Sequence, residues 1–96
     1  MTRYLVLLSF TEQGIRDIKQ TIARASDFRS AVQAAGGKVL SQYWSMGEAD
    51  GCLVLEAPDD ATAAGLLAAL NQKGNVRTRS MRVFDEQETR KMLAGI

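Results

Sequence analysis

The sequence predicts an α+β fold in which a small four-stranded antiparallel sheet carries two helices on one face. Segments of strand and helix character follow one another in the order β-α-β-β-α-β over 96 residues, a length typical of one compact domain covering residues 1–96. Residues 4–8 and 52–55 are apolar at every position. Strands of this kind are buried on both faces. Two long helices cover only one face, so we expect a second copy of the chain to cover the other.

The first half of the chain predicts a strand, a long helix and a second strand. We expect the first strand over residues 3–9, a polar connection over 11–14 and the second strand over 38–45. Between the strands, apolar residues recur at three- and four-residue steps, which predicts one helix of about five turns that ends at the glycines 36–37. Its buried stripe would be Ile15, Ile18, Ile22, Ala25, Phe28 and Val32, and its solvated stripe Arg16, Lys19, Arg24 and Asp27.

The second half predicts a hairpin, a strand, a helix, a strand and a short tail helix. Residues 46–51 form the hairpin connection, and the third strand runs to about residue 57, because Pro58 removes a ladder donor. Asp59 or Asp60 caps the next helix, which ends at Gly74. We expect the fourth strand over residues 75–84 and the tail helix over 85–93. The buried stripe of the second long helix would be Ala63, Leu66, Leu67 and Leu70.

This order predicts a ferredoxin-like arrangement with both helices on one face of the sheet. We expect the first and third strands at the centre, paired in parallel within a sheet that is otherwise antiparallel, and the second and fourth strands at the edges. The helix-free face would then carry either Cys52 and Val54 or Leu53 and Leu55. Monomers rarely expose an apolar patch of this size, so we expect a homodimer or larger homo-oligomer packed sheet to sheet.

Composition excludes several classes of function. A formal net charge of +1 gives no general field that would attract nucleic acid or an anionic membrane, and no apolar run approaches the roughly 20 residues of a membrane span. The N-terminus has no signal-peptide pattern, so we expect a cytoplasmic protein. The sequence has no histidine, which removes the usual general base near neutral pH and the commonest zinc and iron ligand. One cysteine, Cys52, excludes an intrachain disulfide and predicts a buried, inert thiol.

Glu56 is the candidate catalytic residue, because it stands at the end of an otherwise apolar strand. Alternation places it on the same side as Cys52 and Val54. If it faces the space between sheet and partner, desolvation raises its pKa and makes it a general acid or base. The competing interpretation is a strand-end carboxylate paired with an arginine.

The candidate ligand-binding residues are aromatic, acidic and basic side chains near the sheet. Tyr43 and Trp44 are adjacent and point to opposite faces; the one on the helix-free side either stacks on a flat ligand or fills an interface. Asp50 is a turn residue whose side chain can bind nearby backbone amides. Arg77 and Arg79 lie on one side of the fourth strand and Arg82 on the other. Each arginine either holds an anionic ligand or serves as an edge-strand charge that pairs across an interface.

The chain also resembles a known family. The residues that carry the resemblance are Gly14 to Lys19, Gly36-Gly37-Lys38, Tyr43-Trp44 with Gly47 and Asp50, Glu56 to Asp59, and Gly74 to Thr78; in order and spacing they are similar to the GYD domain family, small bacterial and archaeal proteins of the dimeric α+β barrel superfamily. The family's tyrosine before the hairpin aspartate is Ala49 here. The resemblance implies a ferredoxin-like subunit that dimerises through its sheet. It implies little about activity, because the superfamily includes enzymes and ligand-sensing modules.

Two classes of function therefore remain open. The first is a non-catalytic oligomeric module that binds a small organic molecule between sheet and helices or between subunits, without a cofactor or metal. The second is a small cofactor-free enzyme of the isomerase or monooxygenase type that uses Glu56 as acid or base. A pocket that unites Glu56, an arginine and an aromatic residue would favour the enzyme.

Overall fold

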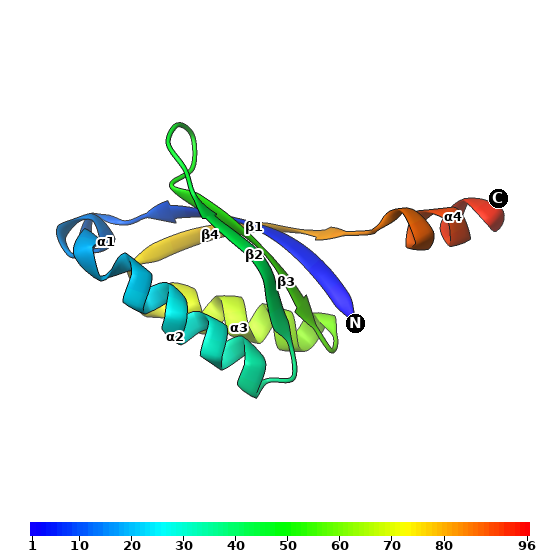
Figure 1. Ribbon diagram of the computed structural model, residues 1–96, viewed down its shortest axis with the longest axis horizontal. Helices are drawn as coiled ribbons and strands as arrows, with labels where there is room; N and C mark the ends of the chain where they lie inside the picture. The colour runs from blue at the N-terminus through cyan, green and yellow to red at the C-terminus, as the bar shows by residue number, and fades with distance from the viewer.

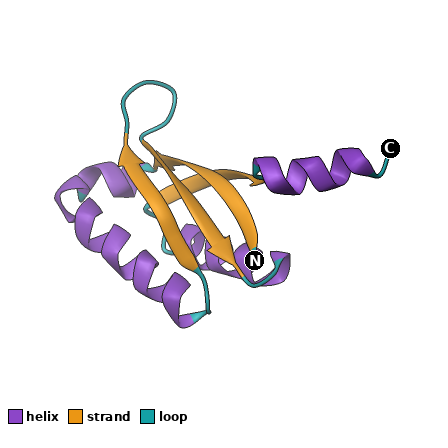
Figure 2. Ribbon diagram, turned by 45° about the vertical axis from the view of Figure 1, so that its right-hand side comes forward, coloured by secondary structure: helices purple, strands orange, loops and turns teal.

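The computed structural model describes residues 1–96 and has the α+β fold that the sequence predicts. A four-stranded antiparallel sheet carries α2 and α3 on one face, and α4 projects from the body at the C-terminus (Figures 1 and 2). None of its helices is long and apolar enough to cross a membrane. In chain order the elements are β1 (Thr2–Phe10), α1 (Glu12–Arg16), the 3-10 turn η1 (Ile18–Gln20), α2 (Thr21–Ala34), β2 (Lys38–Trp44), β3 (Gly51–Ala57), α3 (Asp60–Gln72), β4 (Val76–Val83) and α4 (Glu86–Ala94).

The strand order is β2-β3-β1-β4, so the two wholly apolar strands lie at the centre as expected. The expectation that they pair in parallel is wrong, because β1 and β3 run antiparallel. The helical connection from β1 returns the chain to β2 in the same direction and leaves one position between them. β3 fills that position after a hairpin, and a hairpin reverses the chain direction.

The prediction of one long first helix is wrong in its N-terminal third. The structure divides this segment into α1, η1 and α2. The chain leaves helical geometry at Asp17, with φ −108° and ψ 35°. Gly14 packs so closely on the loop before β4 that an added Cβ would lie 2.1 Å from the Asn75 carbonyl oxygen. This docking sets the direction of α1, and α2 starts again at another angle. Three isoleucines expected in the core are consequently exposed: Ile15 (58%), Ile18 (46%) and Ile22 (67%).

The remaining elements end within one or two residues of the predicted positions. Gly36 and Gly74 take positive φ values of 86° and 85° just after α2 and α3, a conformation that favours glycine at helix ends. Asp59, rather than Asp60, caps α3, because its side chain accepts a hydrogen bond from the Thr62 amide at 2.8 Å. Asp85 caps α4 in a reciprocal capping box with Glu88.

The hydrophobic core lies between the sheet and α2 and α3. Residues opposite one another in the strand register share a face, so Val6 of β1 and Leu53 and Leu55 of β3 point towards the helices. These three side chains are at most 1% exposed. The rest of the core cluster consists of Tyr4, Phe28, Val32, Ala57, Ala63 and Leu67.

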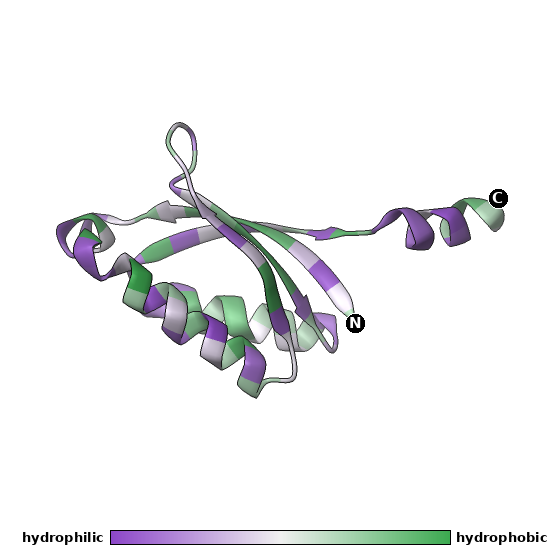
Figure 3. Ribbon diagram, in the orientation of Figure 1, coloured by the Kyte–Doolittle hydropathy of each residue, from purple (hydrophilic) through white to green (hydrophobic).

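The other face of the sheet has no helix over it and is called the open face here. Its central strands are apolar, as the hydropathy colours along β1 and β3 show (Figure 3). The register settles the alternatives for β3, placing Cys52, Val54 and Glu56 on this side. Cys52 is only partly buried within its own chain. The apolar side chains of the open face are Leu5, Leu7, Tyr43, Cys52, Val54, Met81 and Val83.

Candidate functional site

A cavity of about 290 Å³ lies between the helices and the sheet, at the end where the β2–β3 hairpin leaves the sheet. Its volume is close to the lower end of ligand pockets, about 300 Å³. The N-terminal half of α2 and the C-terminal end of α3 form its outer wall. Apolar side chains make up its inner lining: Leu8, Phe10, Ala25, Phe28, Leu53, Leu70 and Val76.

Three candidate residues from the sequence border this cavity, Tyr43, Trp44 and Asp50, and the polar groups of the last two are already engaged. The Trp44 indole N–H donates a hydrogen bond to Thr21 Oγ1 at 3.1 Å, which ties the end of β2 to the start of α2. The Asp50 carboxylate accepts a hydrogen bond from the Phe10 amide at 2.8 Å. Trp44 therefore points towards the helices, and Asp50 holds the hairpin against β1 rather than capping its own turn.

Arg24 also borders the cavity, although the sequence pattern placed it on a solvated stripe. Its guanidinium donates to the carbonyl oxygens of Asp17 at 3.0 Å and Gly14 at 3.3 Å. Helix C-termini leave carbonyl groups without partners, and the break at Asp17 creates such an end. Arg24 provides hydrogen-bond donors for these carbonyl groups, which fixes α1 to α2 beside the cavity.

The remaining polar lining comes mainly from the turn between α3 and β4 and from α2. Asn75 Oδ1 accepts a hydrogen bond from Gln13 Nε2 at 2.9 Å. The Lys73 ammonium and the Asp27 carboxylate, both exposed at the rim, take part in no ion pair or hydrogen bond within the chain. The cavity lining therefore combines a majority of apolar side chains with polar and charged ones from α2, β2 and the α3–β4 turn.

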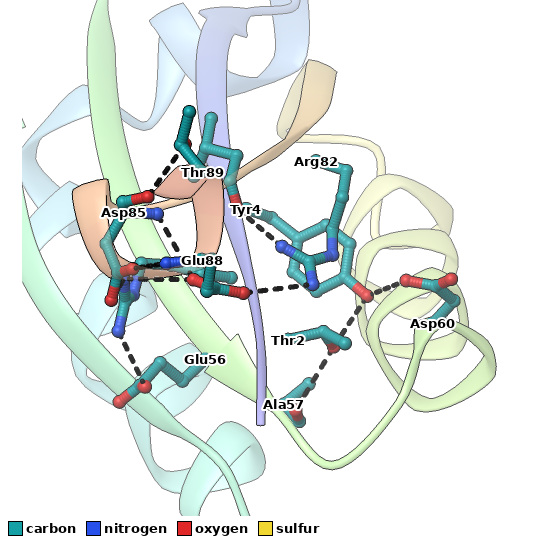
Figure 4. Close-up of polar contacts among 11 residues, drawn as sticks. Thr2, Tyr4, Glu56, Ala57, Asp60, Arg82, Asp85, Glu88 and Thr89 are labelled. Atoms are coloured by element: carbon teal, nitrogen blue, oxygen red, sulfur yellow. Dashed lines mark hydrogen bonds and ion pairs between the residues drawn. The ribbon is translucent and has the colours of Figure 1, made fainter. Parts of the chain in front are cut away.

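Glu56 lies outside this cavity, on the open face. Arg3 of β1 stands opposite it in the register, and Arg3 Nη2 is 3.3 Å from Glu56 Oε2 (Figure 4). Arg3 Nη1 also reaches Asp85 Oδ2 at 3.4 Å. The hydrogen bond to Asp85, followed by that to Glu56, raises the pKa of Arg3, so the guanidinium stays charged. Glu56 is thus a strand-end carboxylate with an arginine partner.

Arg82 lies on the helix side of β4 and belongs to a cluster around Tyr4. Glu88 links this cluster to Arg3, because its carboxylate oxygens lie 3.7 Å from Arg82 Nη2 and 3.9 Å from Arg3 Nη1 (Figure 4). Its guanidinium is 4.4 Å from the centroid of the Phe84 ring and 5.9 Å from that of Tyr4, within cation–π range. The Tyr4 hydroxyl donates to the Asp60 carboxylate (Figure 4). Burial and this hydrogen bond raise the pKa of Tyr4. The cluster is a packed connection between β1, β4 and the start of α3.

Arg77, Arg79 and Tyr43 are on the open face. In the register, Arg77 is opposite Ser9, Arg79 is opposite Leu7, and Tyr43 is opposite Cys52. Both arginines are exposed and have no acidic partner within the chain. Tyr43 is 65% exposed and faces away from Trp44, as alternation predicts. The structure therefore brings Trp44 and Asp50 together at the cavity, which Tyr43 also borders, and places Glu56 and the three arginines elsewhere.

Sequence reasoning missed the cavity itself and most of its lining. Ala25, Phe28 and Leu70 were identified only as core positions, and the periodicity that finds a buried stripe cannot tell a filled core from a hollow one. Arg24, Lys73 and Asn75 gave no signal, because each is an ordinary polar residue near a helix end. The useful pointers were the adjacent aromatics Tyr43 and Trp44 at the end of β2, together with Asp50.

The family model of the GYD domain matches residues 4–93. The chain belongs to the GYD domain family. The match confirms the resemblance read from the sequence and covers every element from β1 to α4. The position at which the family's tyrosine is replaced, Ala49, lies in the hairpin loop, where its carbonyl oxygen accepts a hydrogen bond from Ser45 Oγ at 2.7 Å. None of the curated proteins matches this GYD domain protein.

Solved structures share the fold at low sequence identity. The feast or famine regulatory protein Rv3291c from M. tuberculosis, complexed with L-methionine, is 20% identical with a TM-score of 0.67, and the match covers 88% of this chain and 51% of that one. MtbAldR (Rv2779c) is 15% identical with a TM-score of 0.69, covering 88% and 52%. TTHA0845 from Thermus thermophilus is 16% identical with a TM-score of 0.56, covering 88% and 95%. The GYD domain chain spans about half the length of the first two.

Proposed function

We propose that this protein is a non-catalytic binding module that holds a small, largely apolar organic molecule between its sheet and helices. The observation that carries the proposal is a cavity lined largely by apolar side chains together with a few polar and charged ones, which is the usual composition of a small-molecule site. The binding of L-methionine by Rv3291c, a protein of the same fold, adds support for a ligand-binding role.

The lining indicates what kind of molecule would fit. Aromatic and aliphatic side chains, among them Phe28 and Leu53, would surround an apolar group of the ligand. At the mouth, the Lys73 ammonium is free to meet an anionic or polar group of the ligand. Arg24 and Asp50 are held by backbone groups, so they shape the mouth more than they offer free contacts.

The alternative, a cofactor-free enzyme with Glu56 as acid or base, has less support. Such an enzyme needs Glu56, an arginine and an aromatic side chain around one pocket. Glu56 instead lies on the opposite face from Trp44 and the cavity, and its carboxylate is paired with Arg3. A substrate for Glu56 would have to bind on the open face. Glu56→Gln tests this alternative, because loss of turnover with intact assembly would establish it.

We also propose that two copies of the chain pack open face to open face. Apolar side chains such as Leu5 and Val54 are only half-buried there, and Met81 is 55% exposed. Burying apolar surface contributes roughly 25 cal/mol per Å². A second sheet laid over this face would remove it from water, with Tyr43 as an aromatic side chain in the interface. In this assembly the cavity lies on the outer side of each subunit's sheet.

The experiment that tests the binding proposal uses the single tryptophan as its reporter. Trp44 borders the cavity, so a ligand there should change its fluorescence. Native mass spectrometry of the purified protein would first detect a retained molecule, and hexanoate, benzoate and L-methionine would then be titrated as defined probes.

The matched variants are Ala25→Leu and Ala23→Leu on α2. Ala25 is 8% exposed and borders the cavity, whereas Ala23 is exposed to solvent. Filling the cavity with Ala25→Leu should weaken binding at least tenfold, and Ala23→Leu should leave it unchanged. Equal binding by both variants, or no response to any probe together with no retained molecule, would refute the proposed site.

A further inference from the structure

Asn75, in the turn between α3 and β4, presents an unpaired hydrogen-bond donor beside the cavity. Gln13 Nε2 donates to the Lys73 carbonyl oxygen at 3.1 Å and to Asn75 Oδ1 at 2.9 Å. A backbone carbonyl can only accept, so the Gln13 atom has to be nitrogen and the Asn75 atom oxygen. The Asn75 N–H2 group is left without a partner within the chain. Arg3 Nε is the only buried side-chain nitrogen or oxygen that lacks a hydrogen bond, so the Asn75 N–H2 group remains accessible.

Arg24 lies near Asn75 and adds a positive charge to the lining. The two residues are connected through Gly14, which packs on the Asn75 carbonyl and whose own carbonyl oxygen accepts from Arg24 Nη2 at 3.3 Å. Arg24 is half-buried, and its other partner is the Asp17 carbonyl oxygen. A guanidinium has more N–H groups than these two bonds use, so donors remain. No carboxylate of the chain lies within ion-pair distance of Arg24.

The half-buried acceptors of the lining, in contrast, already hold donors of the chain. Thr21 Oγ1 accepts from the Trp44 indole N–H, and the Asp50 carboxylate accepts from a backbone amide of β1. The charges of Lys73 and Asp27 are both exposed and opposite in sign, so they offset each other. Leaving a donor unpaired in a desolvated site costs free energy. The lining therefore favours a ligand whose polar group is an acceptor.

We propose that the ligand is a small monocarboxylate with an apolar body, and that Arg24 and Asn75 donate hydrogen bonds to its carboxylate. This inference rests on the binding site proposed above and names the class of its ligand. A carboxylate only accepts, so it meets both side chains without adding a donor that needs a partner. Hydrogen bonds to an ionised oxygen are roughly twice as strong as neutral ones. Phe28 and Leu53 would enclose the apolar body.

The first test compares three probes that share a six-carbon chain: hexanoate, 1-hexanol and hexylammonium. Each is titrated near neutral pH with Trp44 fluorescence as the readout. Hexanoate should bind at least tenfold more tightly than hexylammonium, because an ammonium group can only donate. Equal or tighter binding of hexylammonium would refute the carboxylate and leave the cavity as a binding site. If no probe binds and no molecule is retained, the cavity site is refuted, and this assignment with it.

The second test compares Asn75→Asp with Gln42→Glu. Gln42 is the matched position, because its Oε1 accepts from Arg29 Nη1 at 3.0 Å and its N–H2 group is also unpaired. Each change keeps the oxygen that Gln13 or Arg29 requires and replaces the free N–H2 group by a charged acceptor. β2 and β4 lie at opposite edges of the sheet, so the two positions border opposite sides of the cavity.

Asn75→Asp should weaken hexanoate binding at least tenfold and 1-hexanol binding less than threefold, whereas Gln42→Glu should weaken hexanoate binding at most threefold. Equal losses of hexanoate affinity in the two variants would mean that the carboxylate does not lie at Asn75. Unchanged hexanoate binding by Asn75→Asp would overturn the assignment as well. So would an equal loss for hexanoate and 1-hexanol, because that result reports a change in the shape of the cavity.

Discussion

The two faces of the sheet are built from the same kind of sequence and have different environments. Along β3, Leu53 and Leu55 are 1% and 0% exposed beneath the helices, whereas Cys52 and Val54, their immediate neighbours, are half-buried on the open face. The difference shows that an apolar strand does not by itself reveal which of its two faces the chain covers. The helices of this chain cover one side only.

The largest effect on stability is expected from truncating a side chain on the face that the helices cover. Leu55→Ala should lower the free energy of unfolding by about 2–5 kcal/mol, because it removes buried atoms and leaves a cavity in the core. Val54→Ala, one residue earlier and on the open face, should cost less when the subunit is measured in the dissociated state. Urea unfolding monitored by circular dichroism gives both values. Equal losses would mean that the two faces are equally buried within one subunit.

A charge on the open face should act on assembly more than on the fold. Val54→Glu should weaken subunit association at least tenfold, about 1.4 kcal/mol, because it places an unpaired carboxylate in the proposed interface. Ser80→Glu is the control, since Ser80 is exposed on the other side of β4. Native mass spectrometry over a dilution series measures the change. Unaltered association for Val54→Glu would remove the open face from the interface.

Lowering the pH should destabilise α3, which covers the sheet, and α4, which projects from the body, in different ways. Hydrogen bonds from the backbone amides of Thr62 and Glu88 lower the pKa of the caps Asp59 and Asp85, with a further contribution from Arg3 at Asp85. Each carboxylate is then stabilised in the folded state above its unfolded pKa, near 3.9. That stability is lost as the pH falls through the lower folded value.

Asn substitutions at the two caps distinguish the contribution of α3 from that of α4. Asp59→Asn should reduce the acid dependence of global unfolding, because α3 packs on the core. Asp85→Asn should change mainly the hydrogen exchange of α4. A change in global unfolding from Asp85→Asn as large as that from Asp59→Asn would show that α4 is as tightly integrated as α3.

The smallest effect on stability is expected at alkaline pH, from the side chain of Tyr4 on the covered face. Its pKa is raised by burial and by the hydrogen bond to Asp60, so the folded state keeps the proton that the unfolded chain releases near pH 10. Stability is therefore complete below pH 10 and falls as the pH rises through the folded value. Tyr4→Phe should remove this decline, as urea unfolding between pH 9 and 11 would reveal.

Local patterns were sufficient for most of the fold. Alternation placed Arg77 and Arg79 on one side of β4 and Arg82 on the other, and separated Tyr43 from Trp44. Pro58 and the helix caps gave element ends to within one or two residues. The long first helix was wrong because periodicity records only spacing, whereas the contact of Gly14 with the Asn75 carbonyl, 61 residues away in sequence, redirects the chain. The predicted direction of β1 relative to β3 was wrong for another reason, because it overlooked that the β2–β3 hairpin reverses the chain.

The candidate site was less accessible to sequence reasoning. Glu56 was correctly placed on its strand face, and its arginine partner was one of two open interpretations. The cavity arises where α2 and α3 meet the sheet, so it depends on the relative placement of three elements. Arg24 and Lys73, which border it, look like solvated charges when each helix is considered alone.

By itself the sequence determined the class of fold and the central position of the two apolar strands, because these follow from side-chain polarity repeated at the periods of strands and helices. Only the tertiary structure decided which side chains face the helices, where the cavity lies and how α4 leaves the body. Those features depend on how elements pack on one another, and packing depends on contacts between residues that are distant in the chain.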